Sequence, residues 1–279
     1  FLPHHFLVSE PLFRPLMRLL LPSKRPMDNM PTAVDLPQED EFALAAMGAP
    51  SPYQQIAFPN LPSRYQNLLN MENVEPRVEA AFADNLTRFL QSLMLKKNKR
   101  LILKSPTHTG RIAWLAKRYP GCKFIHIARN PVEVFLSTKR LWRRLHEVQG
   151  FQIPRYTDEE LSERVHSDYQ VMYQGYMKGR RELEPHQWIE VQFEELIADA
   201  PAVVRQIYQT LNLGDSNVLE SNVANNMSGR RSYQAEDYQF PPETVADVMR
   251  RWGQYALMFG YDLNTGKRLS EPSELRSRA

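Results

Sequence analysis

Lys123-Phe-Ile-His-Ile-Ala-Arg-Asn-Pro131 is the stretch that decides the fold class. Its apolar run is short, rich in isoleucine and ended by a turn-forming Asn-Pro pair, which is typical of a strand buried in a parallel sheet. A helix is expected to begin near Pro131, because proline suits the first helical position. Arg129 is therefore predicted at the carboxyl end of a core strand, immediately before a helix.

A second run of this kind stands upstream. Arg100-Leu-Ile-Leu-Lys104 is short, apolar and closed by Ser105-Pro106, and a helix is expected over residues 111–119. Strand, helix, strand and helix at this spacing predict a right-handed βαβ unit. Parallel sheets bind ligands at the carboxyl ends of their strands, so Lys104 and Arg129 are expected beside one anion site, together with the amides of the following helix ends.

The rest of the chain continues the α/β pattern. Trp188-Ile-Glu-Val-Gln192 is predicted to be a third core strand, and the polar residues 214–242 are predicted to be irregular. The apolar spacing predicts helices over residues 39–47, 75–99, 158–184, 200–211 and 242–258.

The chain is interpreted as one domain over residues 1–264. Within it, the proline-dense residues 1–76 are expected to form an irregular helical covering, and residues 77–264 the α/β core. The remaining residues, 265–279, are polar and are predicted to be a disordered tail.

Composition limits the partners. The 35 Lys plus Arg nearly balance 32 Asp plus Glu, so the formal net charge of +3 predicts no general affinity for nucleic acid. The single cysteine, Cys122, rules out an internal disulfide and favours the cytoplasm. The apolar stretch from Pro11 to Pro22 is interrupted by charges and is too short to span a membrane, although it leaves open a contact with a membrane surface.

Three of these features together resemble the sulfotransferase superfamily, above all its bacterial-type and tyrosylprotein-sulfotransferase-like branches. They are Leu103-Lys-Ser-Pro-Thr-His108, Phe124-Ile-His-Ile-Ala-Arg-Asn-Pro131 and Ser137. In that family a lysine ends one strand, an arginine ends the next about 25 residues later, and a serine follows the arginine by eight. Lys104, Arg129 and Ser137 have this spacing.

The resemblance implies a P-loop-NTPase-like, three-layer α/β/α fold around a central parallel sheet. It also implies an enzyme that transfers a sulfuryl group from 3′-phosphoadenosine 5′-phosphosulfate (PAPS) to an acceptor hydroxyl or amine, with no metal required. The acceptor is left open as a small molecule, lipid, glycan or peptide. The alternatives are a non-catalytic relative that binds a nucleotide or a partner, and another P-loop-like phosphotransferase.

The resemblance also assigns the donor site. It implies that Arg129 and Ser137 hold the 3′-phosphate of the nucleotide. Lys104 would stabilise the leaving oxygen, with Ser105 beside it. The late loop Ser228-Gly-Arg-Arg-Ser-Tyr233 is expected to cover the nucleotide through Arg230 or Arg231.

The general base is predicted less directly. His108 is the candidate, because an imidazole suits proton abstraction, but it stands four positions after the lysine, whereas cytosolic sulfotransferases have a histidine two positions after it. Glu39, Asp40 and Glu41 are the alternative bases. Glu194, in the segment Phe193-Glu-Glu-Leu196, is interpreted as structural, a residue that orients a loop or caps a helix.

One family element is missing from the sequence. Sulfotransferases carry a first strand followed by a glycine-containing loop whose amides hold the 5′-phosphosulfate. Neither Thr107-His-Thr-Gly110 nor Met227-Ser-Gly-Arg230 follows a strand in the required way. The chain is therefore expected to be an incomplete sulfotransferase domain that lacks this strand and loop, and the fragment is expected to be inactive by itself.

Overall fold

A computed structural model describes residues 38–228 and 240–269 of the chain. Two compact units are present, and each is described by itself. Unit 1 holds the residues up to Arg111 together with Lys139–Tyr176. Unit 2 holds Ile112–Thr138 and the residues from Met177 onward. The one-domain boundaries drawn from the sequence remain a prediction.

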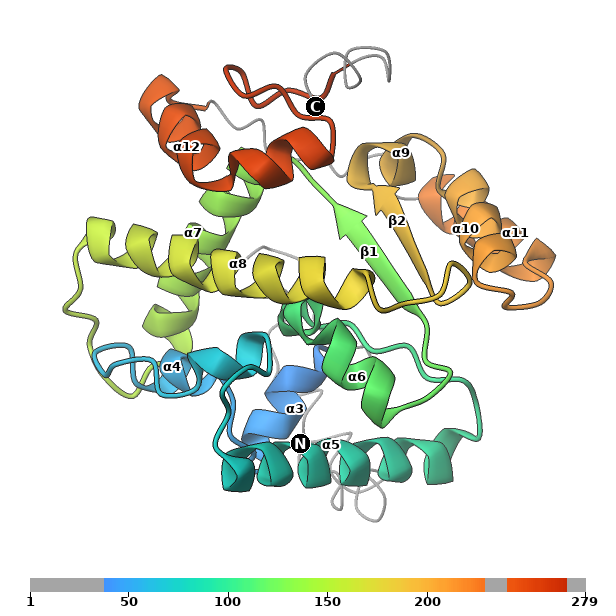
Figure 1. Ribbon diagram of the computed structural model, residues 1–279, viewed down its shortest axis with the longest axis horizontal. Helices are drawn as coiled ribbons and strands as arrows, with labels where there is room; N and C mark the ends of the chain where they lie inside the picture. Colours follow the sequence, from blue (N-terminus) through green and yellow to red (C-terminus); the bar gives the residue numbers. More distant parts are fainter. Residues whose placement is uncertain (1–37, 229–239, 270–279) are drawn as a thin grey trace. The chain divides into compact units, whose positions relative to one another are not determined.

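Unit 1 is helical over its described residues. Its longest helix, α5, carries the predicted amphipathic pattern: it buries Phe82 and Leu86 and ends at Asn98 in the left-handed conformation (φ 40°). Helix α3 packs against α5 (Figure 1). The elements are α3 (Asp40–Ala46), α4 (Gln54–Ala57), the 3₁₀ helices η1 (Gln66–Leu69) and η2 (Pro106–Arg111), α5 (Pro76–Lys97), the later part of α7 (Pro131–Gln149) and most of α8 (Asp158–Arg180).

Unit 2 is built on a parallel pair of strands. β1 (Phe124–Ala128) pairs with β2 (Trp188–Gln192) in a register that places Phe124 opposite Trp188 and Ala128 opposite Gln192 (Figure 1). Helix α10 packs on β2 through a core that includes Ile189, Val191 and Leu211. The helices of this unit are α6 (Ile112–Arg118), α9 (Phe193–Ala198), α10 (Ala200–Thr210), α11 (Asn217–Ser228) and α12 (Pro242–Met258), besides the first turns of α7 and the end of α8.

Most predicted elements are confirmed, but one strand is not. The strand expected at Arg100–Lys104 is wrong, because residues 100–105 have no regular secondary structure and the Ile102 side chain is 85% exposed. A strand forms only against a hydrogen-bonding partner, and no described segment pairs with this one. β1 pairs with β2 instead, so the crossover of the parallel unit runs through α7 and α8.

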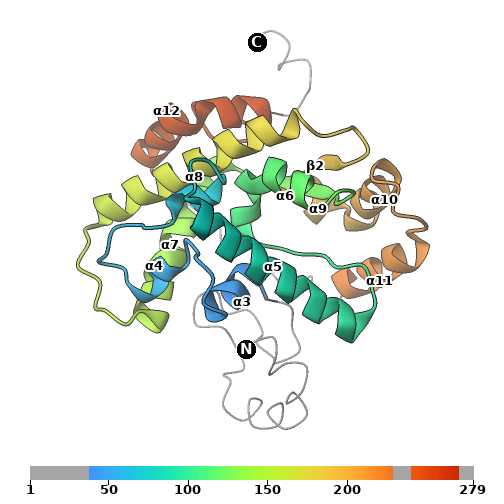
Figure 2. The ribbon, with the colours of Figure 1, turned by 60° about the horizontal axis from the view of Figure 1, so that its bottom comes forward.

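A second correction concerns residues 214–242, which were expected to be irregular. They contain the helix α11, which lies beside α10 in both views (Figures 1 and 2). It meets α10 through charge as well as packing: the Arg205 guanidinium donates to the Glu220 carboxylate at 2.6 Å. A tertiary contact of this kind leaves no periodic signal in the sequence.

The two ends of the chain are described only in part. The predicted tail starts at residue 265, and the Leu269 amide donates to the Gly260 carbonyl at 2.8 Å, which closes a turn over 261–269. The stretch from Pro11 to Pro22 lies outside the described residues. In the part of the chain that the structure describes, no helix has the length and apolar character needed to cross a membrane.

Candidate active site

In unit 1, three consecutive acids at the start of α3 meet three basic side chains of the segment 104–111, one to one. Glu39 pairs with the Lys104 ammonium. Asp40 Oδ2 lies 2.7 Å from His108 Nε2, and Glu41 Oε2 lies 2.6 Å from an Arg111 nitrogen. Five of these six residues are predicted separately from the sequence; Arg111 and the pairing are not.

Glu41 and Arg111 form the buried anchor of this arrangement, and both side chains are 0% exposed. Thr107 and Ser51 also donate to the Glu41 carboxylate, at 2.8 and 2.6 Å. Burial by itself would raise the pKa of Glu41, but the Arg111 charge and these hydrogen bonds outweigh it and hold the pKa below its usual value. The Arg111 Nε donates in addition to the Leu68 carbonyl at 2.6 Å. These bonds fix η2 against the start of α3.

Close backbone packing supports the same placement of η2. A Cβ added at Gly110 would stand 2.2 Å from the Leu69 carbonyl oxygen, and one at Gly175 of α8 would stand 2.3 Å from the Gly110 oxygen. Only glycine permits this approach. The segment predicted to follow a strand is therefore positioned by side-chain anchors and glycine contacts rather than by a sheet.

His108 and Asp40 form a largely buried pair beside the anchor, with side chains 14% and 3% exposed. The second ring nitrogen, Nδ1, and the second carboxylate oxygen, Oδ1, are both buried without a hydrogen-bond partner among the described residues. When the carboxylate accepts the Nε2–H, Nδ1 is left with its lone pair. This is the arrangement of an imidazole prepared to accept a proton.

Lys104 is the accessible member of the group. Its side chain is 75% exposed, while its partner Glu39 is 21% exposed and also accepts a hydrogen bond from the Tyr53 hydroxyl at 2.7 Å. Burial and the Glu39 carboxylate raise the pKa of Tyr53, so this hydroxyl stays a donor. Ser105 is buried next to Lys104 in the chain. An incoming anion reaches the ammonium from solvent.

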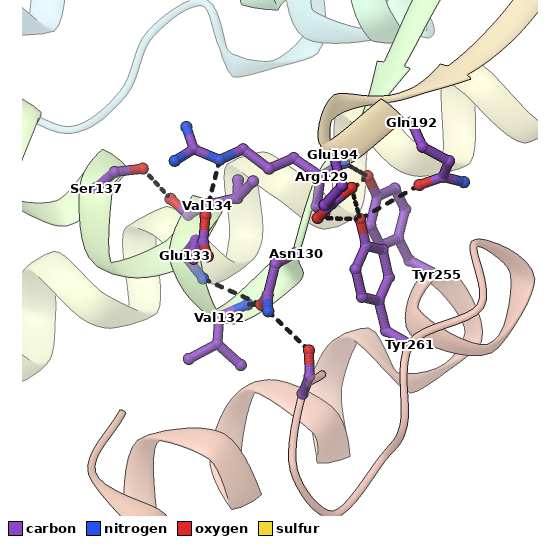
Figure 3. A network of polar contacts seen from close by, with 11 residues as sticks. Arg129, Asn130, Val132, Glu133, Val134, Ser137, Gln192, Glu194, Tyr255 and Tyr261 are labelled. Atoms are coloured by element: carbon purple, nitrogen blue, oxygen red, sulfur yellow. Dashed lines mark hydrogen bonds and ion pairs between the residues drawn. The ribbon is translucent and has the colours of Figure 1, made fainter. Parts of the chain in front are cut away.

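In unit 2, Arg129 extends from the end of β1 as predicted (Figure 3). Its Nε donates to Glu133 at 3.0 Å, and the guanidinium carbon lies 4.4 Å from the centre of the Phe193 ring. The side chain is 30% exposed. No described residue makes a hydrogen bond or ion pair with its two terminal nitrogens. One edge of the guanidinium is held, and the other is available to an anion.

Asn130 caps the helix that follows Arg129. Its Oδ1 accepts from the Val132 amide at 2.9 Å and from the Glu133 amide at 3.3 Å, and its Nδ2 donates to the Gly266 carbonyl at 2.7 Å. The expectation that the first amides of this helix face an anion is therefore corrected, because the Asn130 side chain already satisfies them (Figure 3).

Ser137 lies one helical turn beyond Glu133, on the same face of α7. Its hydroxyl donates to the Val134 carbonyl at 3.1 Å (Figure 3), and because the O–H bond can rotate, the proton can turn from that carbonyl to a ligand. Because Glu133 holds Arg129, the same helix face presents the guanidinium and the Ser137 hydroxyl.

Glu194 has a contact that fits the structural role inferred from the sequence. Both of its carboxylate oxygens lie 3.1 Å from the Tyr261 hydroxyl, and the Gln192 amide oxygen lies 3.3 Å from it (Figure 3). Burial and the Glu194 carboxylate raise the pKa of Tyr261. The pair ties the start of α9 to the turn that follows α12.

A cavity of about 1190 Å³ opens beside these residues in unit 2. Asn130, Glu133 and Glu194 line it together with residues of α12 and of the turn 263–268. Apolar side chains such as Val245 and Met249 form part of the wall, and basic ones form another part. Such a mixture suits a ligand with an apolar ring and negative charge. The basic residues are Arg250, Lys267 and Arg268.

Known proteins resemble this chain over nearly its full length. A model of the family described as "Sulfotransferase family" matches residues 8–217. Two mycobacterial proteins, each named omega-hydroxy-beta-dihydromenaquinone-9 sulfotransferase Stf3, one from Mycobacterium bovis and one from Mycobacterium tuberculosis, are 38% identical over 274 residues. These matches cover 98% of this chain and 69% of each relative. The chain belongs to the sulfotransferase family.

The fold agrees with that membership. The crystal structure of sulfotransferase STF9 from Mycobacterium avium superposes with a TM-score of 0.69 at 18% identity, and the match covers 93% of this chain and 64% of that chain. This chain thus spans a little under two thirds of the length of that solved sulfotransferase. The family, the α/β fold with a parallel sheet, and the enzyme class of the family, sulfuryl transfer, are confirmed.

Of the site residues predicted for this sulfotransferase, Lys104, Ser105 and His108 belong to unit 1, and Arg129 and Ser137 to unit 2. Arg230 and Arg231 lie outside the described residues. Asp40 and Glu41, considered only as alternative bases, turn out to be the partners that hold His108 and Arg111. In residues 38–228 and 240–269, no group of three or more His, Cys, Asp or Glu side chains is arranged to hold a metal ion.

Proposed function

We propose that this sulfotransferase takes its sulfuryl group from PAPS and transfers it to the hydroxyl of a lipid-like alcohol. The observation that carries the donor assignment is the half-open guanidinium of Arg129. Glu133 holds one of its nitrogens at 3.0 Å, and the Phe193 ring lies 4.4 Å from its central carbon, so two nitrogens point at a fixed place without rearrangement. A phosphate takes two such nitrogens in paired, charge-assisted bonds.

The surroundings of Arg129 support a nucleotide rather than a free phosphate. The Ser137 hydroxyl stands on the same helix face and can turn its proton from the Val134 carbonyl to the phosphate. The neighbouring cavity offers apolar wall next to basic side chains, which suits an adenosine with negative charge at its edge. We assign Arg129 and Ser137 to the 3′-phosphate on these grounds.

Lys104 is proposed to serve the leaving group. When the bond between sulfur and the bridging oxygen breaks, negative charge builds on that oxygen, and a mobile ammonium stabilises it. In the described structure Glu39 holds this ammonium. An ion pair in which one partner is this exposed is worth only about 0–1 kcal/mol, so a donor with several negative charges competes for Lys104 easily.

The acceptor proton needs a base, and His108 is proposed to take it. The acceptor oxygen forms its bond to sulfur as its proton passes to the imidazole, and adenosine 3′,5′-bisphosphate departs with the electron pair of the broken bond. The relatives at 38% identity carry a hydroxylated quinone lipid in their name. An acceptor of that class, an alcohol on a long apolar chain, is proposed for this protein as well.

The donor site is tested by isothermal titration of adenosine 3′,5′-bisphosphate into the full-length protein. Arg129→Ala is expected to weaken binding by about 10- to 100-fold, because a hydrogen bond to a charged group contributes about 1.5–3 kcal/mol. Arg181→Ala, at an exposed arginine of the same unit, is the matched control and should bind normally. Absence of binding by the folded wild type, or equal loss in both variants, would overturn the assignment.

The acceptor is tested with PAPS and a quinone lipid that carries a terminal hydroxyl, beside the same lipid without it. Mass spectrometry should show a sulfated product from the first lipid only. Nucleotide binding without any transfer would instead favour the non-catalytic alternative.

A further inference from the structure

We propose that Asp40 is a positioning residue for His108, and that it turns the imidazole so that Nδ1 receives the acceptor proton. This inference deepens the proposed function and rests on it. Asp40 Oδ2 lies 2.7 Å from His108 Nε2, and the Asp40 side chain is almost completely buried. A carboxylate held this close to one ring nitrogen fixes both the tautomer and the orientation of the ring.

The pair is held by its neighbours in the chain on both sides. Glu41, next to Asp40, accepts hydrogen bonds from Thr107, next to His108, and from Arg111, one turn further along η2. The two segments are thus locked in register, with residue 40 opposite 108 and residue 41 opposite 107 and 111. A surface ion pair has no such support, so the contact between Asp40 and His108 is part of a built arrangement.

The ring nitrogen of His108 that does not face Asp40 is the atom expected to accept the proton. His108 Nδ1 is buried and makes no hydrogen bond in the described structure. Leaving a buried polar atom without a partner costs about 1–3 kcal/mol, so a ligand that supplies the partner gains this free energy on binding. The hydroxyl of an acceptor is a partner of the right kind, since it donates to the lone pair that the Nε2–H tautomer leaves on Nδ1.

The other two acids of the run are already engaged, which singles out Asp40. Glu41 is enclosed by donors from Arg111, Thr107 and Ser51. Glu39 accepts from Tyr53 and pairs with Lys104. Neither is placed to receive a proton from an acceptor. The three acids therefore have separate roles: Glu41 stabilises the fold, Glu39 holds Lys104, and Asp40 orients His108.

The charges balance through the step. The acceptor oxygen bonds to sulfur, the bond from sulfur to the bridging oxygen breaks, and its electron pair leaves with adenosine 3′,5′-bisphosphate. The acceptor proton moves to His108 Nδ1, and the Asp40 carboxylate stabilises the imidazolium so formed. The proton then returns to water after the products leave.

Asp40→Asn tests the inference, because it keeps the shape of the side chain and removes its charge. With PAPS and an aliphatic alcohol, kcat is expected to fall at least about 100-fold, the lower range of general-base catalysis. The KM for PAPS and the affinity for adenosine 3′,5′-bisphosphate should stay within about 2-fold, since Asp40 is not assigned to the nucleotide. Asp84→Asn, the same change at an exposed position of α5, is the matched control.

A second readout separates positioning from a structural role. In a His108→Gln background, Asp40→Asn should cause little further loss, because a residue that acts through His108 has nothing left to orient. Both variants should also retain most of their activity toward an acidic phenol that is already ionised, since it needs no base. Loss of equal size with the phenol, or independent losses that multiply, would overturn the inference.

The outcomes distinguish this inference from the proposed function. If the folded wild type transfers nothing from PAPS, the proposed function fails. If the wild type is active and Asp40→Asn matches it, only the role of Asp40 fails. Should Asp40→Asn not fold, Asp40→Glu keeps the charge but moves the carboxylate relative to the ring. A loss of kcat in the folded Asp40→Glu enzyme that disappears in a His108→Gln background supports the inference. A loss that multiplies with that of His108→Gln, or wild-type kcat in Asp40→Glu, contradicts it.

Discussion

The candidate site residues of the two units differ in how their basic side chains are paired. In unit 1, Lys104, His108 and Arg111 each have an acid of their own. In unit 2, Arg129 gives one nitrogen to Glu133, and its two terminal nitrogens have no partner among the described residues. With His108 neutral, the first group has three carboxylates against two cations, so it is suited to taking up a proton or releasing a cation when needed. The second keeps its charge exposed and is suited to holding a permanent anion.

Because of this difference, substitutions at the two sites should change different measured quantities. Breaking a buried ion pair between an acid and a base costs much free energy, so substitutions in unit 1 should lower the free energy of unfolding and kcat. Arg129 is held on one side only, so its loss should act mainly on affinity. The contrast would be contradicted if substitution of Arg129 mainly lowered stability, or if substitutions of the paired residues in unit 1 mainly weakened nucleotide binding.

The largest expected effect is on the buried anchor of unit 1. Glu41→Gln leaves the Arg111 guanidinium buried with no counter-charge, and breaking a buried pair in this way costs about 3–5 kcal/mol. Chemical denaturation should show this loss in the free energy of unfolding. Glu75→Gln, at an exposed glutamate before α5 that makes no capping bond, should be neutral. A loss below about 1 kcal/mol at Glu41 would mean that the pair is not an anchor.

Next in size is the loss of Lys104. Lys104→Ala should reduce kcat by about 100- to 1000-fold, comparable to removing one donor that stabilises a developing oxyanion. Thermal stability should hardly change, because the side chain is largely exposed and its ion pair with Glu39 is weak. Lys99→Ala, at an exposed lysine nearby in the chain, is the control. Equal turnover in the Lys104→Ala enzyme and the wild type would remove Lys104 from the reaction.

The two sites also differ in how far they could be predicted from the sequence. The position of Arg129 at the end of a strand, with Ser137 on the following helix, could be predicted because its determinants are local: an apolar run, an Asn-Pro break and a serine on the next helical turns. The structure adds Phe193 and Glu133, which no short motif specifies. The cap made by Asn130 also follows from local chemistry, although the sequence analysis gave those amides to the anion.

The unit 1 site could not be predicted to the same depth, because its geometry depends on contacts between residues far apart in the chain. Asp40 and His108 are 68 positions apart, and Glu41 and Arg111 are 70 apart. An acidic triplet at a helix start is ordinary helix-end electrostatics when seen alone. The apolar run 100–104 carries the composition of a strand, but a strand also needs a partner, and composition does not report one.

The smallest expected effect compares one buried histidine from each unit. Burial and the Arg164 charge lower the pKa of His146 in unit 1 to about 4, and burial and the Arg180 charge do the same to His126 in unit 2. Both values lie below the ordinary 6.5 of the side chain. Between pH 4 and 6.5 these two imidazoles are therefore protonated in the unfolded chain but neutral in the folded protein.

Stability is thus expected to be fully present above pH 6.5 and to fall as the pH drops toward 4, by up to about 3 kcal/mol for each histidine. Urea denaturation at a series of pH values measures this slope. His146→Gln and His126→Gln should each flatten it, whatever they do to the absolute stability, while His186→Gln, at an exposed histidine, should leave it unchanged. If only one of the two variants flattens the slope, acid sensitivity belongs to that unit alone, and the units differ in their buried histidines as they do in their basic side chains.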